Sequence, residues 1–307
     1  SDELTIHYGL LPRTNRGIFC INELPALAER IQVGLLNVLE ERDVQIRGYK
    51  IRLPLDIMLV ASANPEDYTN RGRIITPLKD RFGAQIRTHY PLDVDVEMGV
   101  VDQEARPVSG NGLHVDVPRF MTEIVAEMSQ QARRSPHVNQ RSGVSVRLSI
   151  ANYETLVANA TRRALRNGEH EIVPRVSDLD ALVASTAGKV EIETLDDGRE
   201  EQVLERIAKA SVLEVFRSRV PPEHLSGVVK GFEEGLTVHT GEDVPAEQYA
   251  SLLQQVPALR DVMADLGVGE SPAAVASSVE FVLEGLHLSK RLNKDAVGGR
   301  ALYRARG

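Results

Sequence analysis

The stretch Gly17-Ile18-Phe19-Cys20-Ile21-Asn22-Glu23 is an apolar run that ends in two polar side chains. A short continuous apolar run after a glycine is typical of a strand that is buried on both faces of a sheet. ATPases use this arrangement, because a rigid strand can hold polar groups beside magnesium and the attacking water. Taken alone, the pattern also fits a strand that ends in an ordinary polar turn.

The sequence around this strand predicts further strands that alternate with helices. Apolar residues recur every four positions from Leu27 to Leu39, as they do on one face of an amphipathic helix. A second apolar run, Ile57–Ala61, predicts another buried strand. Strands separated by helices imply a parallel sheet, so this part is predicted to be α/β. The other predicted elements are a hairpin of Val44–Ile46 and Tyr49–Leu53, a helix near Pro77–Arg81 and a third strand at Ala84–Thr88.

A polar residue and an arginine follow in the order that an ATPase site requires. The second strand leads into Ser62-Ala63-Asn64-Pro65-Glu66, which places Asn64 at the tip of a strand next to the first. A polar side chain there can contact the γ-phosphate or position water. Arg81 lies near a helix end, from which an arginine can neutralise charge on the ATP of an adjacent subunit. The alternative for Arg81 is a surface ion pair with Asp80 or Glu66.

These elements together resemble the ATPase subunit of magnesium chelatase, an AAA+ ATPase, in a wider group that also contains the MoxR-type ATPases. The resemblance is specific over Tyr8–Thr88 and weaker over a helical lid that reaches about Glu193. It is carried by Gly9-Leu10-Leu11 and Asn15–Glu23 (the Walker B strand and its approach), Val44–Leu53 (the hairpin before sensor 1), Asn64-Pro65-Glu66 (sensor 1) and Leu78–Gly83 (the arginine finger).

The resemblance implies a role for five residues. Glu23 would activate the attacking water, and Asn22 would stand at the Walker B position, where it and Glu23 bind magnesium through water. Asn64 would be sensor 1, and Arg81 would be an arginine finger that acts in trans. Arg147, at the start of a predicted lid helix, would be sensor 2; its alternative is a solvated helix residue. The implied cofactors are ATP and Mg²⁺.

Two positions depart from the family pattern. Asn22 replaces the usual Asp, so this position accepts hydrogen bonds but carries no formal charge. The connection Asp67–Thr76 is longer than in chelatases, which affects the expected subunit interface.

The sequence contains no P-loop motif. The pair Gly188-Lys189 has Val183 and Val190 where a P-loop has glycine and Ser or Thr, so it is interpreted as a helix end. We therefore expect the P-loop upstream of Ser1, and the chain to be a fragment.

The chain is predicted to contain three parts. Residues 1–91 would be the C-terminal part of the AAA+ α/β core, 92–195 a helical lid with sensor 2, and 196–307 a further α-helical region of unknown role. A polar segment, Glu193–Glu201, is the expected link between the last two. The predicted helices are Val94–Ala105, Pro118–Arg133, Val146–Asn167, Val176–Lys189, Glu200–Arg219, Ala246–Val256 and Ser277–Leu292.

Composition narrows the class of protein. The 307 residues are 42% hydrophobic and 26% charged, as in an ordinary globular protein, and the net charge of −8 gives no general attraction to nucleic acid. No apolar stretch approaches the roughly 20 residues that cross a bilayer, and the N-terminus lacks signal-peptide features. The single cysteine, Cys20, is expected in the core. These features predict a cytoplasmic protein.

The expected function is ATP hydrolysis by a homo-oligomeric ring, which the resemblance implies to be hexameric. This ring would remodel a partner protein with a von Willebrand A domain or drive metal insertion. The hairpin around Arg47–Lys50 would face the ring's pore or pack on its own subunit. One alternative is a DNA-associated AAA+ regulator or helicase relative, slightly favoured by the basic C-terminal stretch Lys290–Arg306. A simpler interpretation of that stretch is basic charge that is favourable at a helix C-terminus, followed by a solvated tail. A hydrolysis-deficient ring scaffold is the other alternative, because Asn22 replaces Asp.

Overall fold

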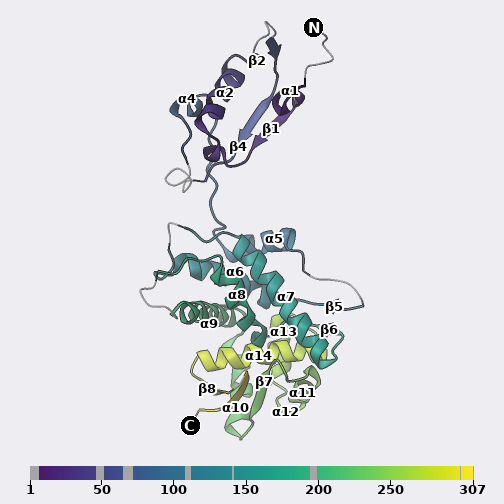
Figure 1. Cartoon of the computed structure of the whole chain (residues 1–307). Coiled ribbons are helices and arrows are strands. Elements are labelled where there is room, and N and C mark those ends of the chain that lie inside the picture. The colour runs from purple at the N-terminus through teal and green to yellow at the C-terminus, as the bar shows by residue number, and fades with distance from the viewer. Residues whose placement is uncertain are drawn as a thin grey trace. The chain divides into compact units, whose positions relative to one another are not determined.

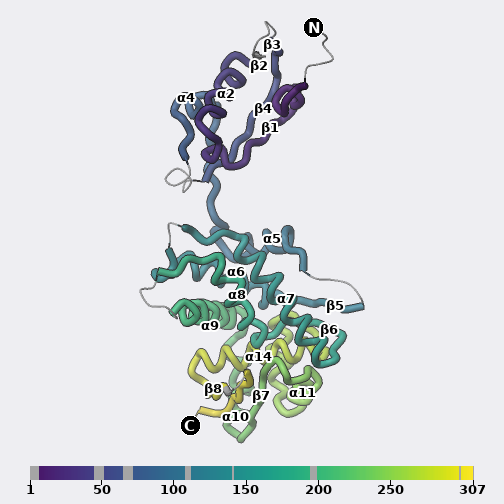
Figure 2. Tube along the Cα trace, in the orientation of Figure 1, coloured from purple at the N-terminus to yellow at the C-terminus, as the bar shows by residue number. Residues whose placement is uncertain are grey.

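A computed structural model describes residues 7–45, 52–64, 72–107, 112–139, 142–193, 199–297 and 299–306. The chain divides into two compact units, unit 1 (Ser1–His89) and unit 2 (Tyr90–Gly307) (Figures 1 and 2). The hairpin tip Arg47–Lys50 and the first half of the connection Asp67–Thr76 lie outside the described residues, as does the middle of the segment Glu193–Glu201. The division into three parts stays a prediction.

Unit 1 is built on two parallel strands. β1 (Ile18–Ile21) pairs with β4 (Met58–Ala61) in the register Ile18↔Met58 to Ile21↔Ala61. β2 (Asp43–Gln45) and β3 (Arg52–Pro54) pair antiparallel, as the predicted hairpin requires. The helices and turns of this unit are α1 (Leu10–Arg13), η2 (Leu24–Ala26), α2 (Glu29–Glu40) and α4 (Thr76–Lys79) (Figure 1).

Among the described residues, one face of the β1–β4 pair is covered by side chains of unit 1, and the other face is left exposed. Leu24, Leu35 and Leu78 are buried, and they pack with Ile21, Leu59 and their neighbours. Ile18 and Met58, which point to the opposite face, are each 63% exposed. The prediction that the first strand is buried on both faces is therefore wrong for this structure.

Cys20 lies on that same uncovered face and is exposed, so the prediction that it belongs to the core is also wrong. The reason is the period of two along a strand: Cys20 and Ile18 share the face opposite to Phe19 and Ile21. The predicted third strand, Ala84–Thr88, is not a strand either. Ile86 is 87% exposed, so its apolar side chain has no sheet to pack against.

Unit 2 is mostly helical and contains two small sheets. β5 and β6 pair parallel, and the antiparallel sheet has the order β7-β9-β8. The elements are α5 (Val94–Glu104), β5 (His114–Val115), α6 (Arg119–Arg134), α7 (Arg147–Asn167), β6 (Glu171–Ile172), η3 (Val176–Ala181), α8 (Leu182–Ala187), α9 (Arg199–Arg219), α10 (Pro222–Glu233), β7 (Val238–Gly241), α11 (Ala246–Ala250), α12 (Leu252–Gln255), α13 (Leu259–Leu266), α14 (Pro272–Leu288), β8 (Leu292–Val297) and β9 (Arg300–Ala305).

The core of unit 2 runs without a break from the predicted lid into the C-terminal region. Helix α9 packs on α6, and α14 packs on α9, α11 and β8. The rings of Phe120 and Phe281 stack at 4.5 Å, and Phe216 meets Phe281 edge-on at 5.8 Å. Gly285 permits this approach, because a Cβ there would lie 2.2 Å from the Phe216 ring. An interior packed this closely does not accept even one added methyl group without rearrangement.

A buried polar network joins the same parts of unit 2. The Asp178 carboxylate accepts hydrogen bonds from the Arg163 guanidinium, from the Arg175 backbone N–H at 2.8 Å and from Asn159 Nδ2 at 3.0 Å. Arg175 Nη1 in turn donates to the carbonyl of Val244 at 2.8 Å. Buried charges of this kind are stable only when they are paired and hydrogen-bonded. Residues on either side of position 196 therefore depend on one another for burial.

The C-terminal basic stretch is a β-hairpin and not the predicted helix end with a solvated tail. Helix α14 ends at Leu288, and β8 and β9 follow it and join β7. Lys294 Nζ and the hydroxyl of Tyr303 both donate to the buried Glu284 carboxylate, at 2.7 and 2.5 Å. Leu292 and Tyr303 are buried on one face of the hairpin, and on the other face Arg304 pairs with Asp295 in the open.

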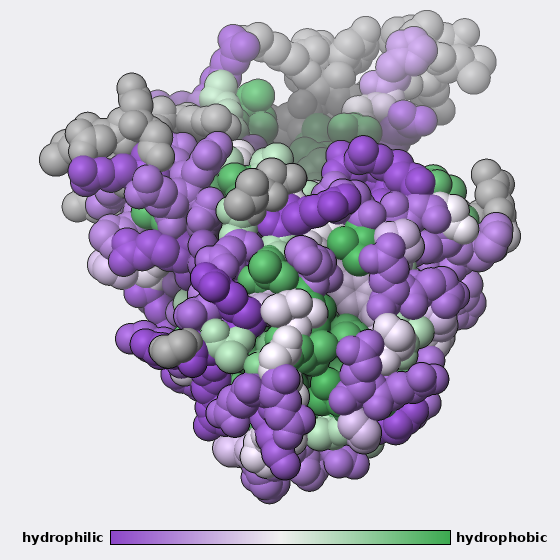
Figure 3. Space-filling model, turned by 90° about the horizontal axis from the view of Figure 1, so that it is seen from below, coloured by the Kyte–Doolittle hydropathy of each residue, from purple (hydrophilic) through white to green (hydrophobic). Residues whose placement is uncertain are grey.

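The surface seen from below shows a hydrophobic area surrounded by hydrophilic residues (Figure 3). Among the helices that the structure describes, none combines the length and the apolar character that a bilayer span requires.

Candidate functional site

The candidate site of unit 1 lies at the carboxyl ends of β1 and β4. Asn22 and Glu23 directly follow β1, and Asn64 stands three residues after the end of β4. Because the two strands are parallel and paired, their carboxyl ends lie at the same edge. All three side chains are exposed. The fold thus brings the predicted Walker B and sensor 1 residues to one edge of the sheet, as the sequence predicts.

Ser62 connects the two strand ends through four hydrogen bonds. Its backbone N–H donates to the carbonyl of Ile21, and its carbonyl accepts from the N–H of Leu24, both at 2.9 Å. Its hydroxyl accepts from the Glu23 N–H at 3.1 Å and donates to Asn22 Oδ1 at 2.5 Å. Every one of these partners lies between residues 21 and 24, so Ser62 holds the whole turn that carries Asn22 and Glu23.

Glu23 has a left-handed backbone conformation, with φ 55° and ψ 53°. This region costs a non-glycine residue roughly 1–2 kcal/mol relative to the right-handed one. Such a conformation persists where surrounding contacts over-determine it, and strained residues of this kind concentrate at functional sites. Here the contacts are those of Ser62 and the 3-10 turn η2 that begins at Leu24. The turn sends Glu23 outward at the strand end and does not return it to the core.

Arg81 is held at the far end of helix α2. Its Nε and Nη2 atoms donate to Glu40 Oε2 at 2.9 and 2.5 Å, and Nη1 donates to the carbonyl of Pro77 at 2.7 Å. The ion-pair partner in the described part of the chain is Glu40 and not the predicted Asp80, and the other predicted partner, Glu66, lies outside the described residues. Helix α2 begins shortly after Glu23 and ends at Glu40, so about 16 Å of helix axis separates its two ends.

Arg147, the predicted sensor 2 residue, is the first residue of α7 in unit 2. Its side chain is exposed, and its backbone N–H donates to Ser145 Oγ at 3.3 Å. Arg147 therefore lies in the first turn of a helix, as the sequence predicts. Because Arg147 belongs to unit 2 and the strand-end residues to unit 1, the structure leaves its role in the site a prediction.

Two residues at this site were missed by reading the sequence. Ser62 stands next to the sensor 1 segment, and a small hydroxyl residue at the end of a strand was the signal available for it. Glu40 carried no signal, because nothing in the sequence relates it to Arg81 across 41 positions.

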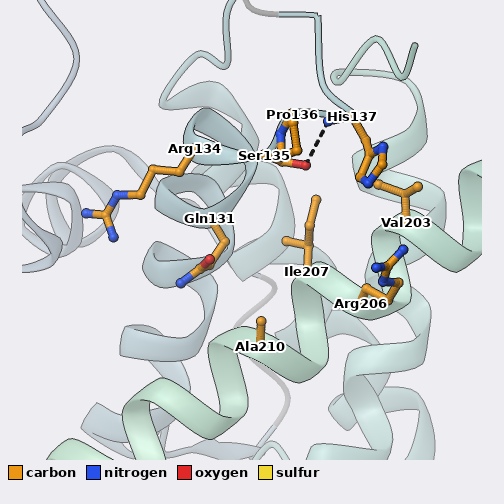
Figure 4. A pocket seen from close by; sticks show the side chains of 9 residues that line it. All are labelled: Gln131, Arg134, Ser135, Pro136, His137, Val203, Arg206, Ile207 and Ala210. Carbon is orange, nitrogen blue, oxygen red and sulfur yellow. Dashed lines mark hydrogen bonds between the residues drawn. The ribbon is translucent and has the colours of Figure 1, made fainter. Parts of the chain in front are cut away.

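A pocket of about 360 Å³ lies elsewhere, between the end of α6, the turn after it and α9 in unit 2 (Figure 4). Figure 4 shows Arg134 pointing away from α9, while His137 and Arg206 lie on the other side, so these three side chains do not converge. None of the predicted site residues lines this pocket. Its lining residues are Gln131, Arg134, Ser135, Pro136, His137, Val203, Arg206, Ile207 and Ala210.

The donors at the strand ends suit a magnesium ion that keeps most of its water. Within the described ranges, no group of three or more His, Cys, Asp and Glu side chains is arranged to hold a metal ion directly. Magnesium in nucleotide sites is commonly bound through one or two carboxylates, the phosphates and water. Glu23 supplies one exposed carboxylate at this edge, and Asn22 an uncharged amide.

Gly188 is the C-cap of α8, as the interpretation of Gly188-Lys189 as a helix end requires.

Comparison with known proteins adds independent evidence. Residues 3–81 match the family model described as the Sigma-54 interaction domain. The magnesium-chelatase 38 kDa subunit of Cereibacter sphaeroides is 38% identical over 95 residues, which make up 30% of this chain and 27% of that protein. The magnesium-chelatase subunit ChlI of Anabaena variabilis is 25% identical over 228 residues, 67% of this chain and 64% of that protein. The chloroplastic subunit ChlI-1 of Arabidopsis thaliana is 31% identical over 100 residues, 32% of this chain and 23% of that protein.

Residues 3–81 thus resemble a domain of the AAA+ class. Within this class, the chain resembles the magnesium-chelatase subunit ChlI, and the resemblance predicted from the motifs between Tyr8 and Thr88 is confirmed. The chain spans less than two thirds of the length of each of these three relatives.

Proposed function

We propose that this chain is part of an ATP-hydrolysing AAA+ motor of the magnesium-chelatase type. The observation that carries the proposal is the meeting of Asn22, Glu23 and Asn64 at one edge of the sheet, held there by the register of β1 and β4. The relatives named above are subunits of magnesium chelatase. The motor would use the energy of ATP hydrolysis to drive metal insertion or to remodel a partner protein. The expected partner contains a von Willebrand A domain, as in MoxR-type systems.

In the proposed mechanism, each strand-end residue acts on a different part of the reaction. The Glu23 carboxylate takes a proton from the attacking water, and Asn64 positions that water or contacts the γ-phosphate. Asn22 hydrogen-bonds to magnesium-bound water or to a phosphate oxygen. When bound, Mg²⁺ neutralises charge on the phosphates. A phosphate-binding loop, which is not among these 307 residues, has to supply most of the nucleotide affinity.

Arg81 serves the neighbouring subunit in this proposal. Its guanidinium is bound to Glu40 and to the Pro77 carbonyl, and the resemblance implies that it acts in trans within a homo-oligomeric ring. The Glu40 contact must then open when the ring forms, so that the guanidinium can reach phosphate. An ion pair with Arg81 29% and Glu40 54% exposed is weak enough to exchange in this way. Arg147 would act as sensor 2, and a hexamer is the ring size that the resemblance implies.

The test is ATP turnover by the intact protein and by its Glu23→Gln variant. The substitution keeps the size of the side chain but removes the base, and general base catalysis is worth about 10²- to 10⁴-fold. We expect nucleotide binding to persist while most turnover is lost. A variant that keeps more than half of the wild-type rate would remove Glu23 from this role. Absence of turnover in the wild-type protein would favour the hydrolysis-deficient scaffold.

A second candidate function is supported by the family model itself, whose description names sigma-54 interaction. A DNA-associated regulator would then be the class of protein. The sequence lacks the Gly-Ala-Phe-Thr-Gly-Ala loop of sigma-54 activators, which opposes this candidate. Binding of the intact protein to duplex DNA, measured over a series of salt concentrations, separates the two. A linear fall of log affinity with log salt would support the regulator, because it reports released counterions.

A further inference from the structure

We propose that Ser62 is a positioning residue of the ATPase site: its hydroxyl sets the backbone conformation of Glu23 and the orientation of the Asn22 amide. This inference rests on the proposed function. It starts from a geometric fact, that one hydroxyl on the strand of sensor 1 binds both residues that follow the other strand. Ser62 therefore acts through these two residues and not on the nucleotide itself.

The direction of the two hydroxyl bonds follows from proton counting. A serine hydroxyl has one hydrogen to donate and lone pairs that accept. The Glu23 backbone N–H can only donate, so Ser62 Oγ accepts there, at 3.1 Å. The hydroxyl hydrogen is then available for the second neighbour, Asn22 Oδ1, at 2.5 Å. In this arrangement Oδ1 faces Ser62, and the Nδ2 donor is the other polar end of the side chain.

This orientation has a chemical consequence for Asn22. A side chain whose oxygen is engaged by Ser62 presents an N–H donor, which suits a phosphate oxygen better than a water molecule bound to Mg²⁺. The usual Asp at this position would present a second carboxylate oxygen instead. Ser62 therefore favours a phosphate contact at position 22, and this fits a strand end that carries no Asp.

The effect on Glu23 is conformational. Its left-handed backbone is unfavourable for a side chain with a Cβ, and the Ser62 hydroxyl is the side-chain group that binds its N–H. Without that bond, the turn relaxes toward commoner conformations, and the carboxylate moves with it. A displacement of about 1 Å at a reacting group can lower a rate about 10²-fold. We expect the Ser62→Ala variant to turn over ATP about 10- to 100-fold more slowly, with nucleotide affinity nearly unchanged.

The experiment compares Ser62→Ala, Ser62→Thr and Thr14→Ala in the intact protein. Thr restores a hydroxyl at position 62 and should recover most of the turnover. Thr14→Ala is the matched control, because it removes another hydroxyl hydrogen bond of unit 1, from Thr14 Oγ1 to the Leu10 carbonyl at 2.9 Å. It should leave turnover within about twofold. In a Glu23→Gln background, Ser62→Ala should cost little further, since its effect passes through Glu23.

A second readout does not depend on catalysis. Hydrogen exchange of the Glu23 amide, followed by NMR, should accelerate in Ser62→Ala and stay slow in Ser62→Thr. Suppose that the wild-type protein is active. If Ser62→Ala then has equal turnover, or if its Glu23 amide exchanges at the wild-type rate, the role of Ser62 is overturned and the proposed function stays intact. An inactive wild-type protein would overturn the proposed function and this inference with it.

Discussion

Replacing Asp178 by alanine should strongly destabilise unit 2. Asp178 is fully buried, and its partner Arg163 is 2% exposed. The carboxylate binds the Arg163 guanidinium at 3.0 Å and also accepts from Asn159 and from the Arg175 N–H. Its removal leaves the Arg163 charge in the interior, where Glu169, at 3.1 Å, is its remaining ion-pair partner among the described residues.

The size of the effect follows from this geometry. Breaking a buried ion pair by removing one partner typically costs about 3–5 kcal/mol, because an uncompensated charge remains. Since Glu169 still pairs with Arg163, we expect the lower end, about 3 kcal/mol. For a unit of this size, that corresponds to a fall in Tm of about 6–12 °C.

The assay is urea unfolding of the purified chain, followed by far-UV circular dichroism, with thermal melts alongside. Lys209→Ala is the matched control, since its pair with Glu205 is exposed on both sides and worth about 0.5 kcal/mol or less. The double variant Arg163→Met/Asp178→Leu should lose less stability than Asp178→Ala, because it leaves no unpaired charge. A loss below about 1 kcal/mol for Asp178→Ala would refute the reasoning.

Three other predictions concern the chemistry of the chain. Arg81→Ala should lose turnover but bind nucleotide, and mixing it with Glu23→Gln should restore part of the activity; no rescue despite proven subunit mixing would argue against action in trans. The chain Ser1–Gly307 contains no P-loop, so calorimetry with ATP and Mg²⁺ should show no micromolar binding, and such binding would reveal an unrecognised nucleotide site. The hydrogen bond that His224 Nδ1 donates to the Asp265 carboxylate raises the pKa of His224 above its ordinary value of 6.5. The pair therefore stabilises the fold below about pH 6.5 and ceases to do so as the pH rises through the folded pKa. NMR titration should show this raised value, and it should fall back in Asp265→Asn.

The sequence by itself determined the two strands, helix α2 and the polar residues at the strand ends. Apolar runs and a four-residue repeat are local properties, so β1, β4 and α2 could be predicted within one or two residues. The parallel pairing also followed, because a helix separates the strands. Once the strands are parallel, Asn22, Glu23 and Asn64 have to share an edge. The core of the candidate site was therefore predictable.

Only the tertiary structure decided which side chains meet across long separations. Ser62 reaches Asn22 across 40 positions, and Arg81 reaches Glu40 across 41. The sheet β7-β9-β8 was missed for a related reason: its strands carry charges whose partners, such as Glu284 for Lys294, come from helix α14. The exposure of Cys20 also depends on which face of the β1–β4 pair is covered. Periodicity shows that a residue has a face but not what lies against it, because burial and pairing are set by the packing of elements that the local pattern does not contain.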